Sequence, residues 1–186
     1  MNNQSIILSG LLFVFSLTTG FSQSERNGEI IFQGGVGVLP TYFMDGGATN
    51  VLPVQASLSY KFNGLISVGA FGGYSSSEGQ AITYKDGSVH QFQNQNFIFG
   101  IRSAVHARNF EKFDIYGGVN FGYNMQDVNV NTITYGEDAI PVSRATDEFI
   151  YGAFVGFTGY LNQNFGLFAE MGYGISLLQA GVTVRL

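Results

Sequence analysis

Two histidines are the first candidates for chemistry in this chain, because the sequence contains no cysteine. A histidine can activate a nearby serine for acyl transfer, but neither His90 nor His106 has a serine two positions later. His90 has Asp86 and Glu78 close by in the sequence, a combination that could support hydrolysis, although one loop histidine is usually only solvated. No His or Cys spacing suits a transition metal. We therefore assign no catalytic residue, no metal ligand and no cofactor.

Isolated charges within largely uncharged segments form the second candidate group. Buried charges must be paired or hydrogen-bonded. The two signs nearly balance in this group, so the residues could neutralise one another if the fold brought them into one interior. The group consists of Lys61, Arg102, Asp114, Glu170 and Arg185.

The elements that carry these residues show a hydrophobic period of two from Ile30 onward. Segments of about ten residues alternate apolar and polar positions, with Gly, Asn and Asp between them, which is typical of strands. In the last segment, Leu178 to Leu186, one face is apolar without interruption. We expect eight strands, and only the segment 65–74 shows no clear facing. The alternating sets begin near Ile30, Val54, Leu65, Phe97, Phe113, Phe149, Phe165 and Leu178.

The connections between these segments alternate between short and long. Short connections are expected at Asn63-Gly64, 108–112, 162–164 and 174–176, and long ones at 40–52, 76–94 and 125–147. Apart from the short 174–176, this is the pattern of a transmembrane barrel with tight periplasmic turns and longer outer loops. The expected fold class is therefore all-β, an eight-stranded antiparallel up-and-down transmembrane β-barrel.

Composition indicates which face of the strands looks outward. Only 11% of the 186 residues are charged, against roughly 25% in ordinary soluble domains. The polar face carries small residues that fit a narrow interior, so the apolar face must contact lipid, where an Arg or Lys costs ~2–4 kcal/mol near the midplane. A soluble lipocalin-like barrel would reverse the two faces. Tyrosines near strand ends are expected to form the interfacial belt: Tyr60, Tyr123, Tyr151, Tyr160 and Tyr173.

The first residues of the chain read as a targeting segment. Residues 1–24 carry no charged side chain, and the apolar run 6–17 suits a signal peptide but is too short for a membrane helix. Gly20 and Ser22 fit a cleavage site before Gln23. We expect a signal peptide over 1–22 and a barrel domain over 23–186.

The signal peptide, the eight alternating strands and the final strand LLQAGVTVRL together resemble the small outer-membrane β-barrel domain family of Gram-negative bacteria, the OmpA/OmpX-like porin family. The resemblance implies an outer-membrane location and recognition by the barrel-insertion machinery. In that family the final residue is usually aromatic, and Leu186 departs from this pattern. The barrel lipid A deacylases share a His-x-Ser pair that this sequence lacks.

A barrel of eight strands has an interior just wide enough for side chains. We therefore expect the five isolated charges named above to form a structural ion-pair network that plugs the lumen. The expected function is non-enzymatic: envelope integrity or surface interaction through long acidic outer loops. The alternatives are a small barrel enzyme acting on outer-leaflet lipid and a soluble lipocalin-like carrier.

The outer loops are the expected contact surface. Residues 81–92 read as a hairpin around Asp86-Gly87, and residues 129–142 as a second one, each suited to strand addition by a partner. The loops hold eight carboxylates against Lys85 and Arg144. Expected partners are outer-membrane lipid, lipopolysaccharide and a surface partner at 76–94 and 125–147. A nucleic-acid partner is excluded because no basic stripe exists.

Overall fold

The computed structural model describes residues 28–41, 48–79, 82–83, 89–107, 112–134 and 147–186. The predicted signal peptide and the outer-loop residues around Asp86 and Gly136 lie outside these ranges. The strands are β1 (Glu29–Pro40), β2 (Ala48–Phe62), β3 (Ile66–Glu78), β4 (Ile82–Thr83), β5 (Val89–His106), β6 (Phe113–Thr134), β7 (Glu148–Tyr160), β8 (Phe165–Gly172) and β9 (Ser176–Arg185). Within the described ranges, no helix is long and apolar enough to cross a membrane.

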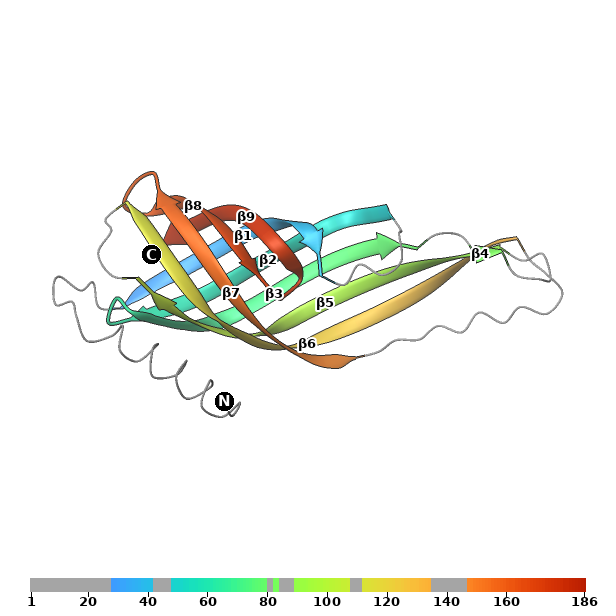
Figure 1. Ribbon diagram of the computed structural model, residues 1–186, viewed down its shortest axis with the longest axis horizontal. Helices are drawn as coiled ribbons and strands as arrows, with labels where there is room; N and C mark the ends of the chain where they lie inside the picture. The colour runs from blue at the N-terminus through green and yellow to red at the C-terminus, as the bar shows by residue number, and fades with distance from the viewer. Residues whose placement is uncertain (1–27, 42–47, 80–81, 84–88, 108–111, 135–146) are drawn as a thin grey trace, which may run out of the picture.

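Eight of these strands close into an antiparallel up-and-down barrel (Figure 1). Each strand pairs with its neighbour in sequence, β9 pairs with β1, and β3 pairs with β5 to complete the circuit. The two-residue β4 lies outside the circuit and pairs with the start of β5, Ile82 opposite His90. The predicted fold class is confirmed. The predicted hairpin over 81–92 is also confirmed where its arms are described.

The barrel exterior carries an apolar belt of membrane height. Outward positions on β5 from Phe97 to Val105, a span of nine residues, are apolar except for Ser103, and those on β6 from Ile115 to Met125, a span of eleven, carry no charged side chain. A tilted transmembrane strand needs about 9–11 residues. Exposure supports this belt, since Val119 at mid-height is 59% accessible. Because the exterior is apolar and the interior polar, the structure argues against a soluble carrier.

The structure shows which side chains of the segment 65–74 point into the barrel, a question that the sequence did not answer. On β3, Ile66 and Val68 point outward, whereas Ser67 and Phe71 are buried in the lumen. Phe71 broke the expected alternation because a large apolar side chain faces the polar side. The long connection expected at 40–52 is shorter in the structure, because β2 begins at Ala48 and includes Pro53. A register shift between Val51 and Val54 accommodates it, as is usual for proline at a bulge.

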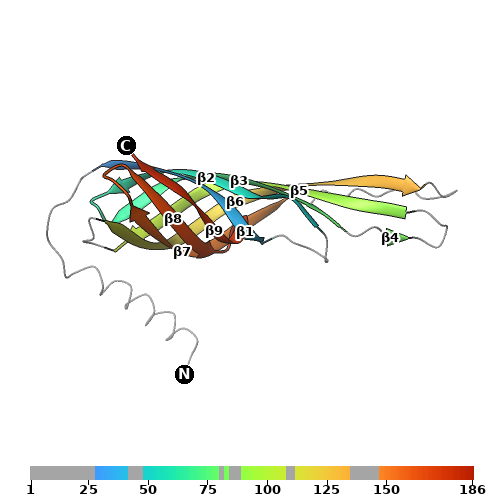
Figure 2. The same cartoon turned by 90° about the horizontal axis from the view of Figure 1, so that it is seen from above.

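Two neighbouring strands continue well beyond the belt (Figure 2). β5 has 18 residues and β6 has 22, whereas β8 has 8 and β9 has 10. The β5–β6 pairing runs without a break from His106↔Tyr116 to His90↔Thr132. Outside the belt, eight residues of β5 (89–96) extend about 26 Å at ~3.3 Å per residue. The long loops expected at 76–94 and 125–147 therefore begin as strand.

Candidate functional site

The barrel lumen gathers most of the buried polar side chains that the structure describes. Its central group is built around Glu170 on β8. Arg102 Nη2 on β5 donates to Glu170 Oε2 at 2.6 Å, and both side chains are 4% exposed. Gln179 Nε2 donates to Glu170 Oε1 at 2.7 Å, and the Tyr116 hydroxyl donates to Oε2 at 3.3 Å. Glu170 thus fixes groups from three other strands at one level of the lumen.

Other contacts extend this central group across the barrel. Gln33 Nε2 on β1 lies 3.0 Å from the Tyr116 hydroxyl and 3.3 Å from Thr183 Oγ1 on β9. The Arg102 guanidinium stacks over the Phe154 ring, 4.2 Å from its centroid. These contacts link residues that are far apart in sequence, so they stabilise the closed circuit of strands rather than any single hairpin.

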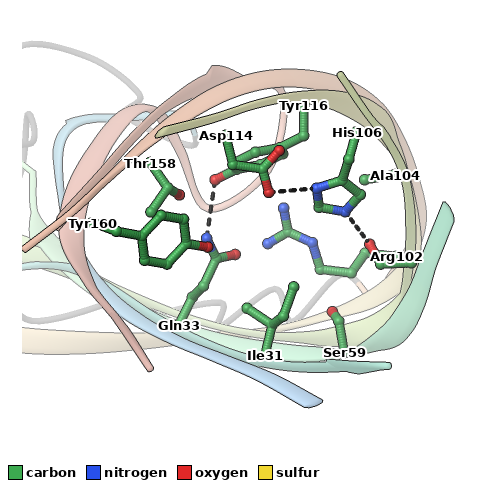
Figure 3. A pocket seen from close by; sticks show the side chains of 11 residues that line it. Ile31, Gln33, Ser59, Arg102, Ala104, His106, Asp114, Tyr116, Thr158 and Tyr160 are labelled. Atoms are coloured by element: carbon green, nitrogen blue, oxygen red, sulfur yellow. Dashed lines mark hydrogen bonds and ion pairs between the residues drawn. The ribbon is translucent and has the colours of Figure 1, made fainter. Parts of the chain in front are cut away.

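A second polar group lies nearer the short turns and is built around Asp114 (Figure 3). Lys61 Nζ is 3.4 Å from Asp114 Oδ2, and His106 Nδ1 is 2.8 Å from the same oxygen. His106 Nε2 lies 2.8 Å from the Ser67 hydroxyl. If Nδ1 carries the proton and donates to Asp114, Nε2 accepts from Ser67. All four side chains are buried, so the group is largely removed from bulk solvent.

A third charged contact lies at the mouth of the barrel beside the short turns. Arg185 Nε is 3.4 Å from Glu29 Oε1, and its guanidinium lies 3.4 Å from the centroid of the Tyr160 ring. The structure therefore places Tyr160 against Arg185 and along the lumenal cavity (Figure 3). The sequence had predicted it in the interfacial belt of tyrosines. The reason is a change of environment at the strand end, where the charged lumen opens and a tyrosine can cover a guanidinium.

Four of the five predicted lumenal charges therefore meet in two pairs. Arg102 meets Glu170 and Lys61 meets Asp114, whereas Arg185 pairs with Glu29, a residue that the sequence prediction did not include. His106 was also missed. His106 lies four residues after Arg102 on the same strand, and this even spacing was a usable signal, because it places both side chains on the polar side.

The outer part of the lumen holds an apolar cluster beside the buried amides of Asn96 and Asn124. Phe71, Ile98, Ile150 and Ile175 form one buried cluster, and Ile98 and Ile175 are 0% and 1% exposed. Ile98 lies an even number of residues from Arg102 on β5, and Ile150 an even number from Phe154 on β7, so each pair shares the inward face. The sequence prediction nevertheless missed this cluster, because it assigned only polar and small residues to the inward face.

The order Ser67, His106, Asp114 has the hydrogen-bonding sequence of a nucleophile, a base and an orienting carboxylate. The adjoining cavity measures only about 20 Å³ and is lined by Arg102, Tyr116 and neighbouring lumenal residues. That volume suits about one water molecule. It cannot hold an acyl chain. Among the described residues, no group of three His, Asp or Glu side chains could hold a metal ion.

Comparisons with known proteins find structures but no sequence relatives. No family model matches the sequence, and no curated protein matches it. The N-terminal β-barrel domain of Pseudomonas aeruginosa OprF is 11% identical, with a TM-score of 0.53, covering 88% of this chain and 100% of that one. The outer membrane protein Ail of Yersinia pestis is 15% identical, with a TM-score of 0.46, covering 87% and 100%. Neisserial surface protein A is 10% identical, with a TM-score of 0.44, covering 88% and 99%.

At these identities the likeness concerns the fold alone, and the OprF domain carries it. The alignment with that small barrel domain spans all of its chain. Combined with the apolar belt, this fold is that of an outer-membrane-type β-barrel. The expected architecture is therefore confirmed by both geometry and comparison.

Proposed function

We propose that the protein is a non-enzymatic integral outer-membrane barrel with a closed lumen that acts through its outer face. The observation that carries the proposal is the contrast between an ordinary nine-to-eleven-residue belt and a β5–β6 ribbon that continues about 26 Å beyond it. A strand pair needed only for anchoring would end at the belt. The role proposed for the protein is therefore to maintain envelope integrity or to interact with partners at the cell surface.

Closure of the lumen rests on two layers. The charged groups around Glu170 and Asp114 fill the inner part, and the apolar cluster around Ile98 fills the outer part. An ion crossing the barrel would have to break the buried ion pairs and then enter an apolar constriction. We therefore expect the reconstituted protein to show no single-channel conductance or only tiny steps. Large, stable steps of porin size would contradict the closed lumen.

Surface interaction rests on the outer edge of β6. Pairing between β6 and β7 ends at Asn124↔Glu148, whereas pairing between β6 and β5 continues to Val89↔Thr134. A strand edge beyond the barrel wall can accept an extended segment of a partner at positions 129–134. The acidic outer loops at 76–94 and 125–147 favour a partner surface that is basic or carries bound divalent cations.

Export and assembly complete the proposal. Residues 1–22 would direct the chain across the inner membrane, and β9 (Ser176–Arg185) would be read by the barrel-insertion machinery. Lipid and lipopolysaccharide are the expected partners in the membrane. The lumenal charges Lys61, Arg102, Asp114, Glu170 and Arg185 serve a structural role here, together with Glu29 and His106.

Two measurements test the location and the outer-face role. The protein should fractionate with outer membranes and migrate faster on gels when unboiled, and recovery in the soluble fraction would contradict the proposal. Deletion of residues 81–92 should leave this fast-migrating form intact while removing the capture of surface partners. Loss of the folded form on deletion would show instead that the ribbon is needed to build the barrel.

One observation favours a second candidate function, hydrolysis at Ser67. The Ser67–His106–Asp114 order is correct for an activated serine, but its cavity lies in the half of the lumen toward the short turns, away from outer-leaflet lipid. A small fluorophosphonate should label the folded wild type but not Ser67→Ala if this function is real. An altered lipid A acylation pattern caused by His90→Ala would support enzymatic action at the outer face.

A further inference from the structure

The outward face of β3, β5 and β6 changes its chemistry abruptly at the outer rim of the belt. The last apolar row consists of Tyr74, Phe97 and Met125, which the strand register aligns across the three strands. Phe97 and Met125 are exposed on the barrel exterior. This row therefore marks the level at which hydrocarbon gives way to headgroups, where aromatic side chains gather.

The next two rows on the same face are polar. The register aligns Ser76, Gln95 and Asp127 directly outside the apolar rim, and then Glu78 with Gln93. Rows on one face of a sheet are two residues, about 7 Å, apart. Ser76 is buried, at 2% exposure, so we call only the other four residues, Gln95, Asp127, Glu78 and Gln93, the rim wall. Along the strands, the rim wall thus covers the first ~14 Å beyond the last apolar row, where the headgroups of neighbouring outer-leaflet lipids lie.

Charge at the rim wall disfavours anionic headgroups. Within the described ranges, the Lys and Arg side chains belong to the lumen or to its short-turn end: Lys61, Arg102, Lys112 and Arg185. The rim wall itself carries two carboxylates and no cation. Recognition of lipid phosphates depends on clustered Lys and Arg. A phosphate group would meet repulsion here rather than attraction.

The rim wall instead offers partly ordered amide groups, one of which is held by the buried Ser76 hydroxyl. Gln93 Nε2 donates to Ser76 Oγ at 3.4 Å, and Gln91 Nε2, two residues further along the same face, donates to the Gly79 carbonyl at 3.4 Å. Each amide keeps its oxygen and its second N–H available. Neutral sugar hydroxyls both donate and accept hydrogen bonds, so they match a surface of amides and carboxylates and need no cation.

We propose that the rim wall binds the neutral saccharide headgroup of a glycolipid in the surrounding outer leaflet. The inference rests on the proposed membrane insertion and adds the ligand class and its position. The acyl chains of the glycolipid would lie against Phe97 and Met125, while its sugar hydroxyls reach Gln95 and Gln93. A lipid held at both levels would position the β5–β6 ribbon at the membrane surface.

The experiment exploits a chain that contains no tryptophan. Phe97→Trp places the only tryptophan in the last apolar row, directly below the rim wall. The full chain is then refolded into phosphatidylcholine vesicles. Quenching is measured with diglucosyl diacylglycerol and with phosphatidylcholine, each carrying the same dibrominated acyl chains. We expect the local association constant to be about fivefold higher for the glycolipid, the effect of one or two added hydrogen bonds.

Matched variants assign the effect to the rim wall. Adding Gln93→Ala and Gln95→Ala to the reporter should reduce the preference to about one. Gln126→Ala, an amide on the opposite face of β6, should leave it fivefold. A reporter at Met171→Trp, at the outer end of β8, should show no preference.

Failure of the inference is separable from failure of the proposed function. Heat-modifiable migration is recorded for every sample, and its absence shows that the chain does not insert. Equal quenching by the two lipids in an inserted barrel overturns the saccharide site and leaves insertion standing. Stronger quenching by brominated phosphatidylglycerol that depends on Mg²⁺ and is abolished by EDTA also overturns it, because the carboxylates would then bind an anionic headgroup through a bridging cation.

Discussion

The strands β5 and β6 pass through two environments, and the same alternation of side chains has different consequences in each. Below the row of Phe97 and Met125, inward residues such as Arg102 and His106 are buried in the lumen, and outward residues are exposed on the apolar belt. Above that row the same pairing continues without the surrounding circuit, and outward residues such as Gln95 are polar and part-exposed. The β5–β6 register is the same on both sides of the row of Phe97 and Met125. The effect of a substitution on the unfolding free energy therefore depends on whether the residue lies below or above that row, not on which strand carries it.

The largest expected effect comes from breaking the central ion pair in the lower region. Arg102→Ala leaves Glu170 buried without its charge partner, which costs about 3–5 kcal/mol in the free energy of unfolding. Urea unfolding in lipid vesicles, followed by circular dichroism and gel migration, measures this cost. In the upper region, Gln93→Ala should change the same quantity by less than about 0.5 kcal/mol.

A double substitution sharpens this comparison. Arg102→Met combined with Glu170→Gln removes both charges and keeps an amide that can contact Gln179 and Tyr116. The double variant should be more stable than Arg102→Ala, because no uncompensated charge remains. If the double variant is the less stable of the two, an unpaired Glu170 carboxylate is not the main cost of Arg102→Ala.

A charge on the outward face gives the second-largest contrast. Val119→Arg at mid-belt should destabilise the inserted barrel by about 2–4 kcal/mol, because the guanidinium faces hydrocarbon. Gln95→Arg, which lies above the apolar rim on the neighbouring strand, should stay within about 0.5 kcal/mol of the wild type. Equal costs at the two positions would place the membrane boundary elsewhere.

Removal of the missed histidine comes next in size. His106→Ala deletes one of the two partners of Asp114 and the partner of Ser67, while Lys61 remains in place. We expect a loss of about 1–3 kcal/mol in unfolding free energy, the cost of leaving buried polar groups without a hydrogen bond. Ser67→Ala should lose less, since Asp114 keeps both of its partners. A larger loss for Ser67→Ala would mean that the Ser67 hydroxyl has a further role in the lumen.

This lower region also shows the reach of sequence reasoning. Alternation predicted the strand circuit and placed Lys61, Arg102, Asp114 and Glu170 in one lumen, because parity along a strand fixes its facing. Parity cannot state which charge meets which, since that depends on the stagger between strands far apart in sequence. Arg185 therefore pairs with Glu29, which was not a member of the predicted set. Ile98 and Phe71 were missed because the rule equated the inner face with polar residues.

The upper region was predicted less completely for a different reason. The sequence placed residues 125–128 in a connection and predicted a hairpin only over 129–142, whereas the structure continues β6 through both stretches to Thr134. Cross-strand pairing with β5 supplies the backbone hydrogen bonds that composition alone would not suggest. Long strands with polar faces are therefore underestimated wherever a single partner strand is enough to order them.

The smallest expected effect tests whether the two regions are independent. Deleting residues 81–92 removes β4 and the first four residues of β5, all of them above the belt. No lumenal ion pair and no row of the apolar belt is lost. The barrel circuit keeps every β3–β5 pairing from Glu78↔Gln93 downward. The unfolding free energy should therefore change by less than about 1 kcal/mol, and a loss comparable to that of Arg102→Ala would mean that the ribbon and the barrel fold as one cooperative unit.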